Sequence, residues 1–261
     1  MKALPPSLER RCRFRPELFV PLSVGRTRIG WLRPELAARL AGWPKVFKST
    51  AEQVRLLDKD ALTPIVEQLA QEGFIPGWRN ERYRIADLFE IERAAARPFG
   101  LATQAVHVNG IVAGERMWLA RRSSGKATDP GMLDNIVGGG VPAGLSIEEV
   151  VLKEAWEEAG IPAELAQRVT PAGTIEVMRE VPQGVAFEVA HVYDLELPSD
   201  FLPVNQDGEV SEFTLVSFAE ARRLIEETDD VAADAALVAL DCLNRRSVRP
   251  GSASAAAGRT T

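Results

Sequence analysis

Residues 138–162 read GGGVPAGLSIEEVVLKEAWEEAGIP, a glycine-rich loop followed by a short acidic segment. The spacing of its residues predicts a helix over 147–159. Ser146 and Glu149 stand three residues apart, as in the capping box that begins a helix, and Gly160 followed by Pro162 is typical of a helix end. Both ends of the predicted helix are therefore marked in the sequence itself.

The acidic residues of this helix gather on one side. Glu154, Glu157 and Glu158 fall within an arc of roughly 100°, because they are three or four residues apart. The side expected to face a core holds Leu152, Ala155, Trp156 and Ala159. Carboxylates this close repel one another, and a divalent cation bound by them relieves the repulsion. The alternative is a solvated acidic face, which is common on helices; the glycine loop favours the metal site.

Composition limits the function classes. The formal net charge of -6 argues against a general nucleic-acid binder, which needs a basic face. The only histidines are His107 and His191, so a bound metal would be held mainly by oxygen, which favours Mg2+ or Mn2+. Cys12 and Cys242 show no metal-ligand spacing and are expected to be reduced thiols. No apolar run approaches the roughly 18 residues that span a bilayer, so we predict no membrane association and a cytoplasmic location.

The chain divides near residues 95–100. We predict an N-terminal α+β extension domain over 1–97, a second domain over 98–246, and a disordered Ser-, Ala- and Gly-rich tail over 247–261. Strands are expected over 102–108 and 117–121, joined through the turn-prone pairs Asn109-Gly110 and Ala113-Gly114.

Further along, the sequence predicts a hairpin of 174–179 with 185–195, a strand at 213–216, and helices over 219–226 and 231–244. Strands on both sides of one central helix indicate an α+β fold in which a mixed sheet is packed between helices. Within the N-terminal part, we expect strands between residues 20 and 32, a helix that begins at Pro34, and a helix over 62–72.

The loop and helix resemble the Nudix box, which reads Gly, five residues, Glu, seven residues, Arg-Glu-apolar-x-Glu-Glu-x-Gly-apolar. Here the first glycine is Gly139, and the closing segment is Lys153 to Ile161. The resemblance implies that Glu154, Glu157 and Glu158 bind the metal, with a carbonyl of the glycine loop, assigned to Gly139, as a further ligand. Two positions depart from the pattern: Leu145 replaces the early glutamate, and Lys153 replaces the arginine, keeping its charge but losing its bidentate fork.

The resemblance continues outside the box, in residues 99–110, 118–135 and 207–213. It points to the Nudix subfamily related to the Nudix portion of fungal thiamine pyrophosphokinase, which carries the same Leu and Lys variants and an N-terminal extension. This subfamily implies a pyrophosphohydrolase that converts thiamine diphosphate, or oxidised and damaged forms of it, to the monophosphate. Two alternatives stay open: a catalytically weak or inactive Nudix ligand-binding module, and a Nudix hydrolase of nucleoside diphosphate derivatives.

In the predicted reaction water attacks a diphosphate phosphorus, while metal ions neutralise the developing charge. The candidate residues fall into groups by role. Lys153 belongs to the catalytic group, and Glu209 is the candidate base or extra ligand, with Glu212 as its competitor. Candidates to bind the substrate are Arg121, Arg122, Lys126, Asn135 and Trp118, although surface charges, a turn residue and a core tryptophan are the alternative readings. His107 is expected to be structural.

Residues 130–135 also resemble a segment of isopentenyl diphosphate isomerases, which share the fold. That isomerisation needs a cysteine acid and a histidine-rich metal site, and this chain has no cysteine between residues 12 and 242. We therefore reject it. The predicted partner is a small diphosphate, and the N-terminal domain is expected to select the substrate or to form a homodimer.

Overall fold

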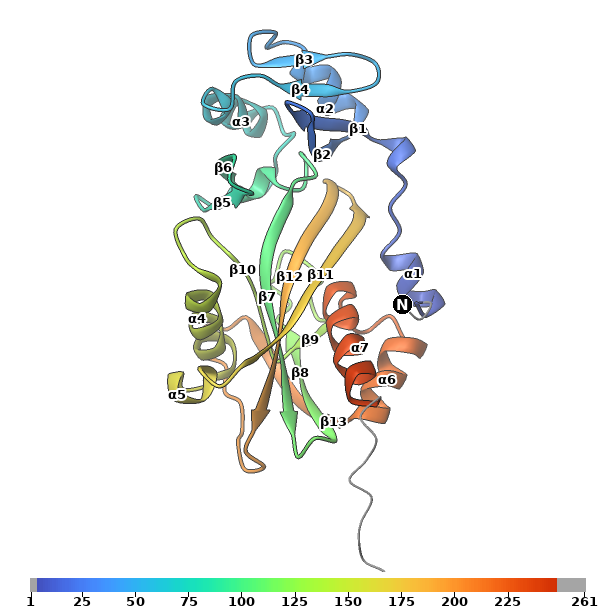
Figure 1. The fold of residues 1–261 in the computed structure, drawn as a ribbon, viewed down its shortest axis with the longest axis vertical. Helices are drawn as coiled ribbons and strands as arrows, with labels where there is room; N and C mark the ends of the chain where they lie inside the picture. The colour runs from blue at the N-terminus through green and yellow to red at the C-terminus, as the bar shows by residue number, and fades with distance from the viewer. Residues whose placement is uncertain (1–3, 248–261) are drawn as a thin grey trace, which may run out of the picture.

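The computed structural model describes residues 4–247. A seven-stranded mixed sheet lies at its centre, with a smaller N-terminal unit stacked on one end (Figure 1). The helices and strands of the N-terminal part are α1 (Pro6–Arg11), η1 (Pro16–Leu18), β1 (Val20–Val24), β2 (Thr27–Leu32), α2 (Pro34–Leu40), β3 (Phe47–Ser49), β4 (Val54–Leu56), α3 (Leu62–Gln71), β5 (Arg82–Ile85), β6 (Phe89–Glu92) and η2 (Arg93–Ala95).

The central part contains β7 (Ala102–Val112), β8 (Arg116–Arg122), β9 (Leu133–Asn135), β10 (Val137–Gly140), α4 (Ile147–Ala159), α5 (Ala163–Ala166), β11 (Thr170–Val181), β12 (Gly184–Leu197), β13 (Val210–Ser217), α6 (Phe218–Glu227) and α7 (Ala233–Ser247). The predicted tail lies outside the described residues except for Ser247. No helix within residues 4–247 is long and apolar enough to cross a bilayer.

The N-terminal unit has a four-stranded sheet in the order β2-β1-β4-β3. The two-stranded β5–β6 ribbon lies between this sheet and the central sheet (Figure 1). Its core includes Leu32, Leu40, Phe47 and Leu69. Helix α1 is the exception, because Leu8 is buried in the apolar cluster of α6 and α7 instead. The first helix of the chain is therefore part of the layer formed by the last two (Figure 1).

The central sheet runs β11-β12-β7-β8-β13, and two short strands lie off this path. Strand β7 pairs with β10 over Ala105–Val108 and with β8 only over Gly110–Val112, while β9 pairs with β8. The sheet is therefore split between β9 and β10. This fork is the feature that positions the functional site.

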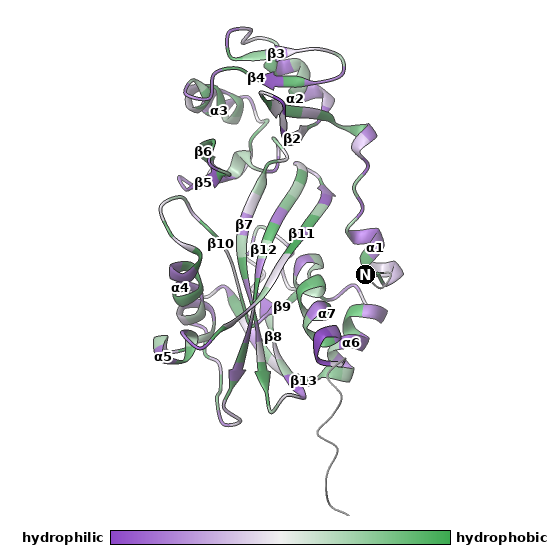
Figure 2. Ribbon diagram, viewed as in Figure 1, coloured by the Kyte–Doolittle hydropathy of each residue, from purple (hydrophilic) through white to green (hydrophobic). Residues whose placement is uncertain are grey.

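Two helical layers cover the sheet. Helix α4 buries Val150, Val151 and Ala155 with Val106 and Val108 of β7. On the opposite face, α6 and α7 pack on β8 and β9 through an alanine-rich cluster. Figure 2 shows both green and purple residues on α4 and α6, as expected for helices that cover a sheet on one side and meet solvent on the other. The predicted mixed sheet between helices is confirmed.

One predicted turn is wrong. Strand β7 continues through Asn109 and Gly110, and the chain reverses only at Ala113 and Gly114, both in the left-handed region. The buried amide of Asn109 donates to Asp194, 3.0 Å away, and a Cβ at Gly110 would lie 2.9 Å from Ile136 Cγ2. Close packing, not a turn, therefore accounts for this Asn-Gly pair.

Candidate active site

Helix α4 has the predicted boundaries. The Ser146 hydroxyl accepts a hydrogen bond of 3.2 Å from the Glu149 N–H, and the Glu149 carboxylate accepts one of 2.8 Å from the Ser146 N–H. Gly160 ends the helix with φ of 61°. These local bonds fix the start and end of the helix, and hence the direction in which its glutamates project.

The three glutamates of α4 are buried to different depths. Their side chains are 37% exposed for Glu157, 13% for Glu154 and 6% for Glu158. Burial raises the pKa of Glu158 to about 8, although the Gly138 N–H donates to its carboxylate at 2.7 Å. Burial also raises the pKa of Glu154. Two neighbouring buried carboxylates are costly unless a cation joins them.

The core-facing side of α4 differs from the prediction at one residue. Trp156 is 54% exposed, whereas Ala155, Glu158 and Ala159 are buried. The buried side of the helix includes Glu158 and so lies at a different angle around the helix axis than predicted. The Trp156 indole therefore lies on the exposed side. The prediction that Trp156 faces the core is wrong.

Lysine side chains lie among the glutamates. Lys153 Nζ is 3.0 Å from Glu154 Oε1 and 2.6 Å from Glu157 Oε2. Lys126 Nζ contacts the carboxylate of Glu209 and lies 3.8 Å from Glu158 Oε1. The two ammonium groups thus neutralise part of the charge of four clustered carboxylates. Hard oxygen donors in this number fit Mg2+ or Mn2+.

The glycine run of β10 is adapted to these side chains. Gly138 donates its N–H to Glu158, and a Cβ at Gly139 would lie 2.5 Å from Glu154 Cδ. A Cβ at Gly140 would overlap the hydroxyl of Tyr83, which lies on β5 of the N-terminal unit. Each glycine therefore makes room for, or bonds with, a different polar side chain.

The main-chain groups of β10 alternate between β7 and the fork. The Val141 N–H donates to the Gln104 carbonyl of β7 at 2.8 Å, and Gly139, two residues earlier, lies opposite Val106. The N–H of Gly138 points away from β7, because it donates to Glu158. In an antiparallel strand the N–H and the carbonyl of one residue point to the same side, so the Gly138 carbonyl also points away from β7. We therefore move the expected carbonyl ligand from Gly139 to Gly138.

Both candidate arginines are already paired. Arg121 lies 3.2 Å from Asp230 and 3.7 Å from Glu212, while Arg122 pairs with Asp134 and donates to the Thr128 carbonyl at 3.0 Å. Their guanidinium groups stabilise the ends of β8, β9 and β13, and a phosphate would have to displace those carboxylates.

Two other substrate candidates are buried. Trp118 is 8% exposed and lies in the apolar cluster beneath α4. Asn135 is 1% exposed; its carbonyl oxygen lies 3.0 Å from His107 Nδ1, and its amide donates to Asn109 at 3.1 Å. The indole nitrogen of Trp118 is itself buried, and the amide of Asn135 is paired with His107 and Asn109, so neither presents an accessible polar atom and neither is part of the proposed site.

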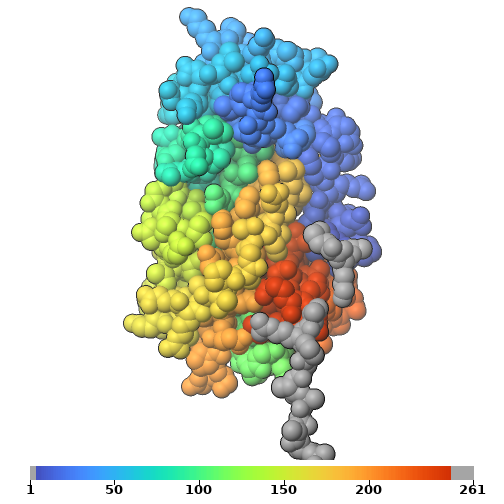
Figure 3. Space-filling view, in the orientation of Figure 1, coloured from blue at the N-terminus to red at the C-terminus, as the bar shows by residue number. Residues whose placement is uncertain are grey.

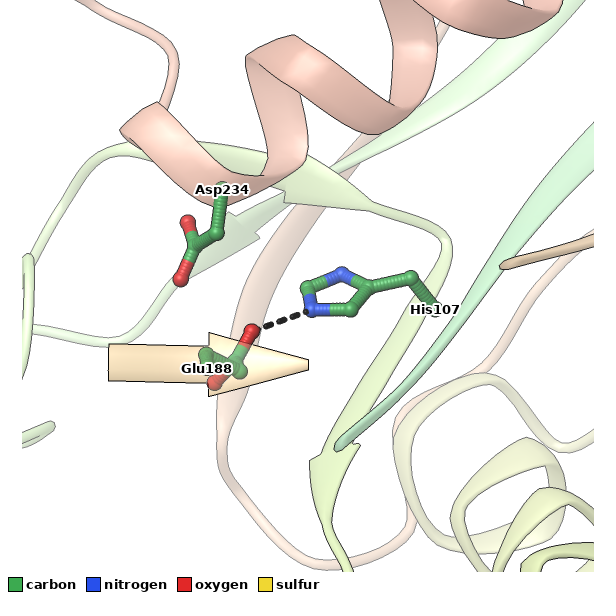
Figure 4. Close-up of side chains that lie close together, drawn as sticks. All are labelled: His107, Glu188 and Asp234. Atoms are coloured by element: carbon green, nitrogen blue, oxygen red, sulfur yellow. Dashed lines mark hydrogen bonds and ion pairs between the residues drawn. The ribbon is translucent and has the colours of Figure 1, made fainter. Parts of the chain in front are cut away.

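His107 is part of a cluster that the sequence did not reveal. Figure 4 shows its imidazole, on β7, beside Glu188 of β12 and Asp234 of α7. His107 Nε2 lies 3.1 Å from Glu188 Oε1. Burial opposes the charged imidazole, but the bond and charge of Glu188, with the charges of Asp134 and Asp234, outweigh it and raise the pKa of His107 to about 10. His107, Glu188 and Asp234 therefore form a charged network around a buried imidazole.

Glu209 directly precedes β13, the edge strand of the sheet, and contacts Lys126. Burial opposes ionisation of this carboxyl, but the hydrogen bond and charge of Lys126 outweigh it and lower the pKa of Glu209. Its competitor Glu212 is 63% exposed and pairs with Arg121. Of the two, Glu209 is the carboxylate beside the α4 glutamates.

Comparison with protein families gives two matches. The NUDIX domain matches residues 103–239, and a domain of unknown function (DUF4743) matches residues 7–103. The first match covers more than half of the chain, including every α4 glutamate and Glu209.

Several curated proteins are similar to this chain. Nudix hydrolase 24, chloroplastic, of Arabidopsis thaliana is 36% identical over 256 residues, 90% of this chain and 70% of the plant protein. Nudix hydrolase 20, chloroplastic, of the same plant is 40% identical over 202 residues, 74% of this chain and 54% of that protein. Isopentenyl-diphosphate Delta-isomerase of Cereibacter sphaeroides is 30% identical over 155 residues, 59% of this chain and 82% of the isomerase.

Proposed function

This chain belongs to the Nudix family of phosphoanhydride hydrolases, and from that premise we propose that it converts a small diphosphate, thiamine diphosphate or an oxidised analogue, to the monophosphate. The observation that carries the proposal is the burial of Glu158 next to Glu154, with the Gly138 N–H and a Lys126 ammonium 3.8 Å away as its partners. Such a carboxylate pair is an incomplete cation site.

Glu154, Glu157 and Glu158 would hold Mg2+ or Mn2+, with the Gly138 carbonyl on the open edge of β10 as a further ligand. When bound, the metal supplies positive charge that neutralises the phosphoryl oxygens. Glu209 accepts the proton of the attacking water, since its lowered pKa keeps it ionised at neutral pH. Lys153 keeps the Glu154 and Glu157 carboxylates in place through its two ion pairs.

The hydrolase reading is tested by phosphate release from thiamine diphosphate with Mg2+. Glu157→Gln should lower kcat by a factor of about 100 or more, because it removes one charged oxygen ligand. The matched control is Glu148→Gln, which changes an exposed glutamate on the first turn of the same helix. EDTA should abolish activity, and added Mg2+ should restore it. Equal phosphate release by the wild type and Glu157→Gln would remove the catalytic assignment, whereas no release by either would leave the binding-module alternative.

The substrate class rests on the subfamily resemblance. A panel of thiamine diphosphate, its oxidised analogues, ADP-ribose and nucleoside diphosphate sugars separates the two hydrolase alternatives by kcat/KM. Preference for ADP-ribose would reject the thiamine proposal. The isomerase alternative lacks its acid: Cys242 is buried, and Cys12 packs against the α6–α7 cluster.

Other predictions concern the role of the N-terminal unit, the partners of the protein and its location in the cell. We propose that the N-terminal unit, residues 1–97, selects the substrate, with homodimer formation as the alternative; light scattering on the full chain measures the latter. Deletion of this unit is a poor test, because it would remove Leu8 from the α6–α7 cluster. The lack of nucleic-acid and membrane partners stays a prediction. The cytoplasmic location also stays a prediction, since the two plant relatives are named chloroplastic.

A further inference from the structure

The N-terminal unit contacts the glycine loop that precedes α4. The Tyr83 hydroxyl occupies the space that a side chain at Gly140 would need, and the Arg82 carbonyl accepts a hydrogen bond of 2.7 Å from the Ala143 N–H. Figure 3 shows the teal segment around β5 and β6 lying directly against the yellow-green segment that leads into α4. The ribbon of the N-terminal unit is thus one wall of the region beside β10.

Tyr83 faces the same side of β10 as the His107 cluster. Gly138 and Gly140 are two residues apart in a strand, so their missing side chains would project from the same face. A Cβ at Gly138 would lie 3.5 Å from His107 Nδ1, while one at Gly140 meets Tyr83. The phenol and the imidazole therefore lie toward the same face of β10, and Figure 4 shows Glu188 beside that imidazole.

The Tyr83 hydroxyl is a donor without an acceptor. No hydrogen bond joins it to any other residue between 4 and 247, and its oxygen is not among the buried polar atoms that lack a partner, so the hydroxyl is accessible although Tyr83 as a whole is only 6% exposed. Burial raises the pKa of Tyr83 to about 12, and the carboxylates of Glu81, Glu188 and Glu154 add to the rise. The phenol therefore keeps its proton and remains a hydrogen-bond donor.

The ring is held by a second residue of the N-terminal unit. The Arg93 guanidinium lies 5.4 Å from the centre of the Tyr83 ring and pairs with Glu81 at 2.7 Å. This cation–π contact favours one ring orientation. Arg93 is accordingly a positioning residue for Tyr83.

The central domain offers few free donors for an anionic substrate. Arg121, Arg122, Lys126 and Lys153 each pair with carboxylates. A diphosphate at the fork would share these cations with the carboxylates, so a neutral hydrogen-bond donor would add to its binding. The Tyr83 hydroxyl is such a donor, and it comes from outside the Nudix match.

Resting on the proposed function, we infer that the N-terminal unit supplies Tyr83 to the active site, where its hydroxyl donates a hydrogen bond to an oxygen of the bound diphosphate. The same oxygen is present before and during the reaction. Loss of the donor therefore weakens binding of substrate and transition state alike, and raises KM without lowering kcat.

The test compares Tyr83→Phe with Tyr193→Phe. Tyr193 is the only other tyrosine and packs against the apolar cluster under α4, so its replacement removes the same hydroxyl on the opposite face of the sheet. Tyr83→Phe should raise KM about tenfold or more for both thiamine diphosphate and ADP-ribose, wherever each is turned over, with kcat within about twofold. Tyr193→Phe should change neither constant.

Two kinetic results overturn the inference while leaving the hydrolase intact: an unchanged KM for Tyr83→Phe, or a loss confined to one substrate, which would place the contact on its organic part. Binding gives a readout that does not need turnover. In the Mg2+-loaded Glu157→Gln background, calorimetry should show that adding Tyr83→Phe weakens thiamine diphosphate about tenfold or more. Equal affinity of the two proteins rejects the contact. Failure of the wild type to release phosphate would reject the proposed function instead.

Discussion

Lys126 places its ammonium 3.8 Å from the carboxylate of Glu158, the most buried glutamate of α4, and also contacts Glu209. In the metal-free protein, the Lys126 ammonium neutralises part of the negative charge that a bound divalent ion would neutralise. The two cations therefore compete for the same carboxylates.

Replacing Lys126 by methionine should tighten Mg2+ binding severalfold, because the site becomes one charge more negative. The melting temperature should fall without metal and recover at saturating Mg2+. Calorimetric titration and thermal unfolding measure the two effects, and Lys48→Met, on the exposed side of β3, is the control. Weaker Mg2+ binding by Lys126→Met would contradict competition.

Gly140 and Tyr83 should be energetically coupled. Gly140→Ala forces the ring of Tyr83 away from the loop and should destabilise the protein, whereas the same change should cost much less once Tyr83→Ala has vacated the space. We expect a coupling free energy of about 1 kcal/mol or more from urea unfolding of the two single variants and the double variant. Strictly additive effects would mean that the two residues do not share this space.

His107 should make stability depend on alkaline pH. Its pKa of about 10 in the folded protein lies above the ordinary value of 6.5. The stabilisation is therefore complete below pH 6.5 and is lost as the pH rises toward 10. The free-energy gap between wild type and His107→Gln should shrink by about 2 kcal/mol or more from pH 6 to pH 10. A gap that stays constant over this range would show that the imidazole is neutral when folded.

Gly160 should resist substitution at the end of α4. Its φ of 61° suits glycine, and an added Cβ would lie 2.8 Å from the Val204 carbonyl. Gly160→Ala should therefore lower the free energy of unfolding by roughly 1–3 kcal/mol, measured in urea. Gly125→Ala is the matched control, since its Cβ would meet nothing within 4 Å. Equal stability of the two variants would contradict the strain.

Local signals were enough to predict the helix that carries the glutamates. The Ser146–Glu149 box and Gly160 act through bonds within a few residues, so the sequence contains all the information needed for the predicted bounds. The five long strands of the central sheet and the two C-terminal helices were also predicted, because their apolar periodicity reflects burial on one or both faces. The short strands β9 and β10 were not predicted, and the glycines of β10 form a strand where the sequence indicates a loop.

Side-chain partners far apart in the sequence could not be predicted. Arg121 meets Asp230, 109 residues later, and this pairing decides whether its guanidinium is free for phosphate. Trp156 was misplaced because a helical wheel cannot show that a glutamate, Glu158, occupies the buried stripe. Tyr83 carried no motif at all; its importance depends on the glycine that it meets 57 positions further along the chain.

The fork in the sheet has a consequence for how easily this protein can change. Because Gly138 offers Glu158 a peptide N–H and not a side chain, nearly all single amino-acid replacements leave that donor in place. Proline, which lacks the N–H, is the exception. The anchoring of Glu158 is therefore set by the path of the backbone and not by which side chain stands at position 138.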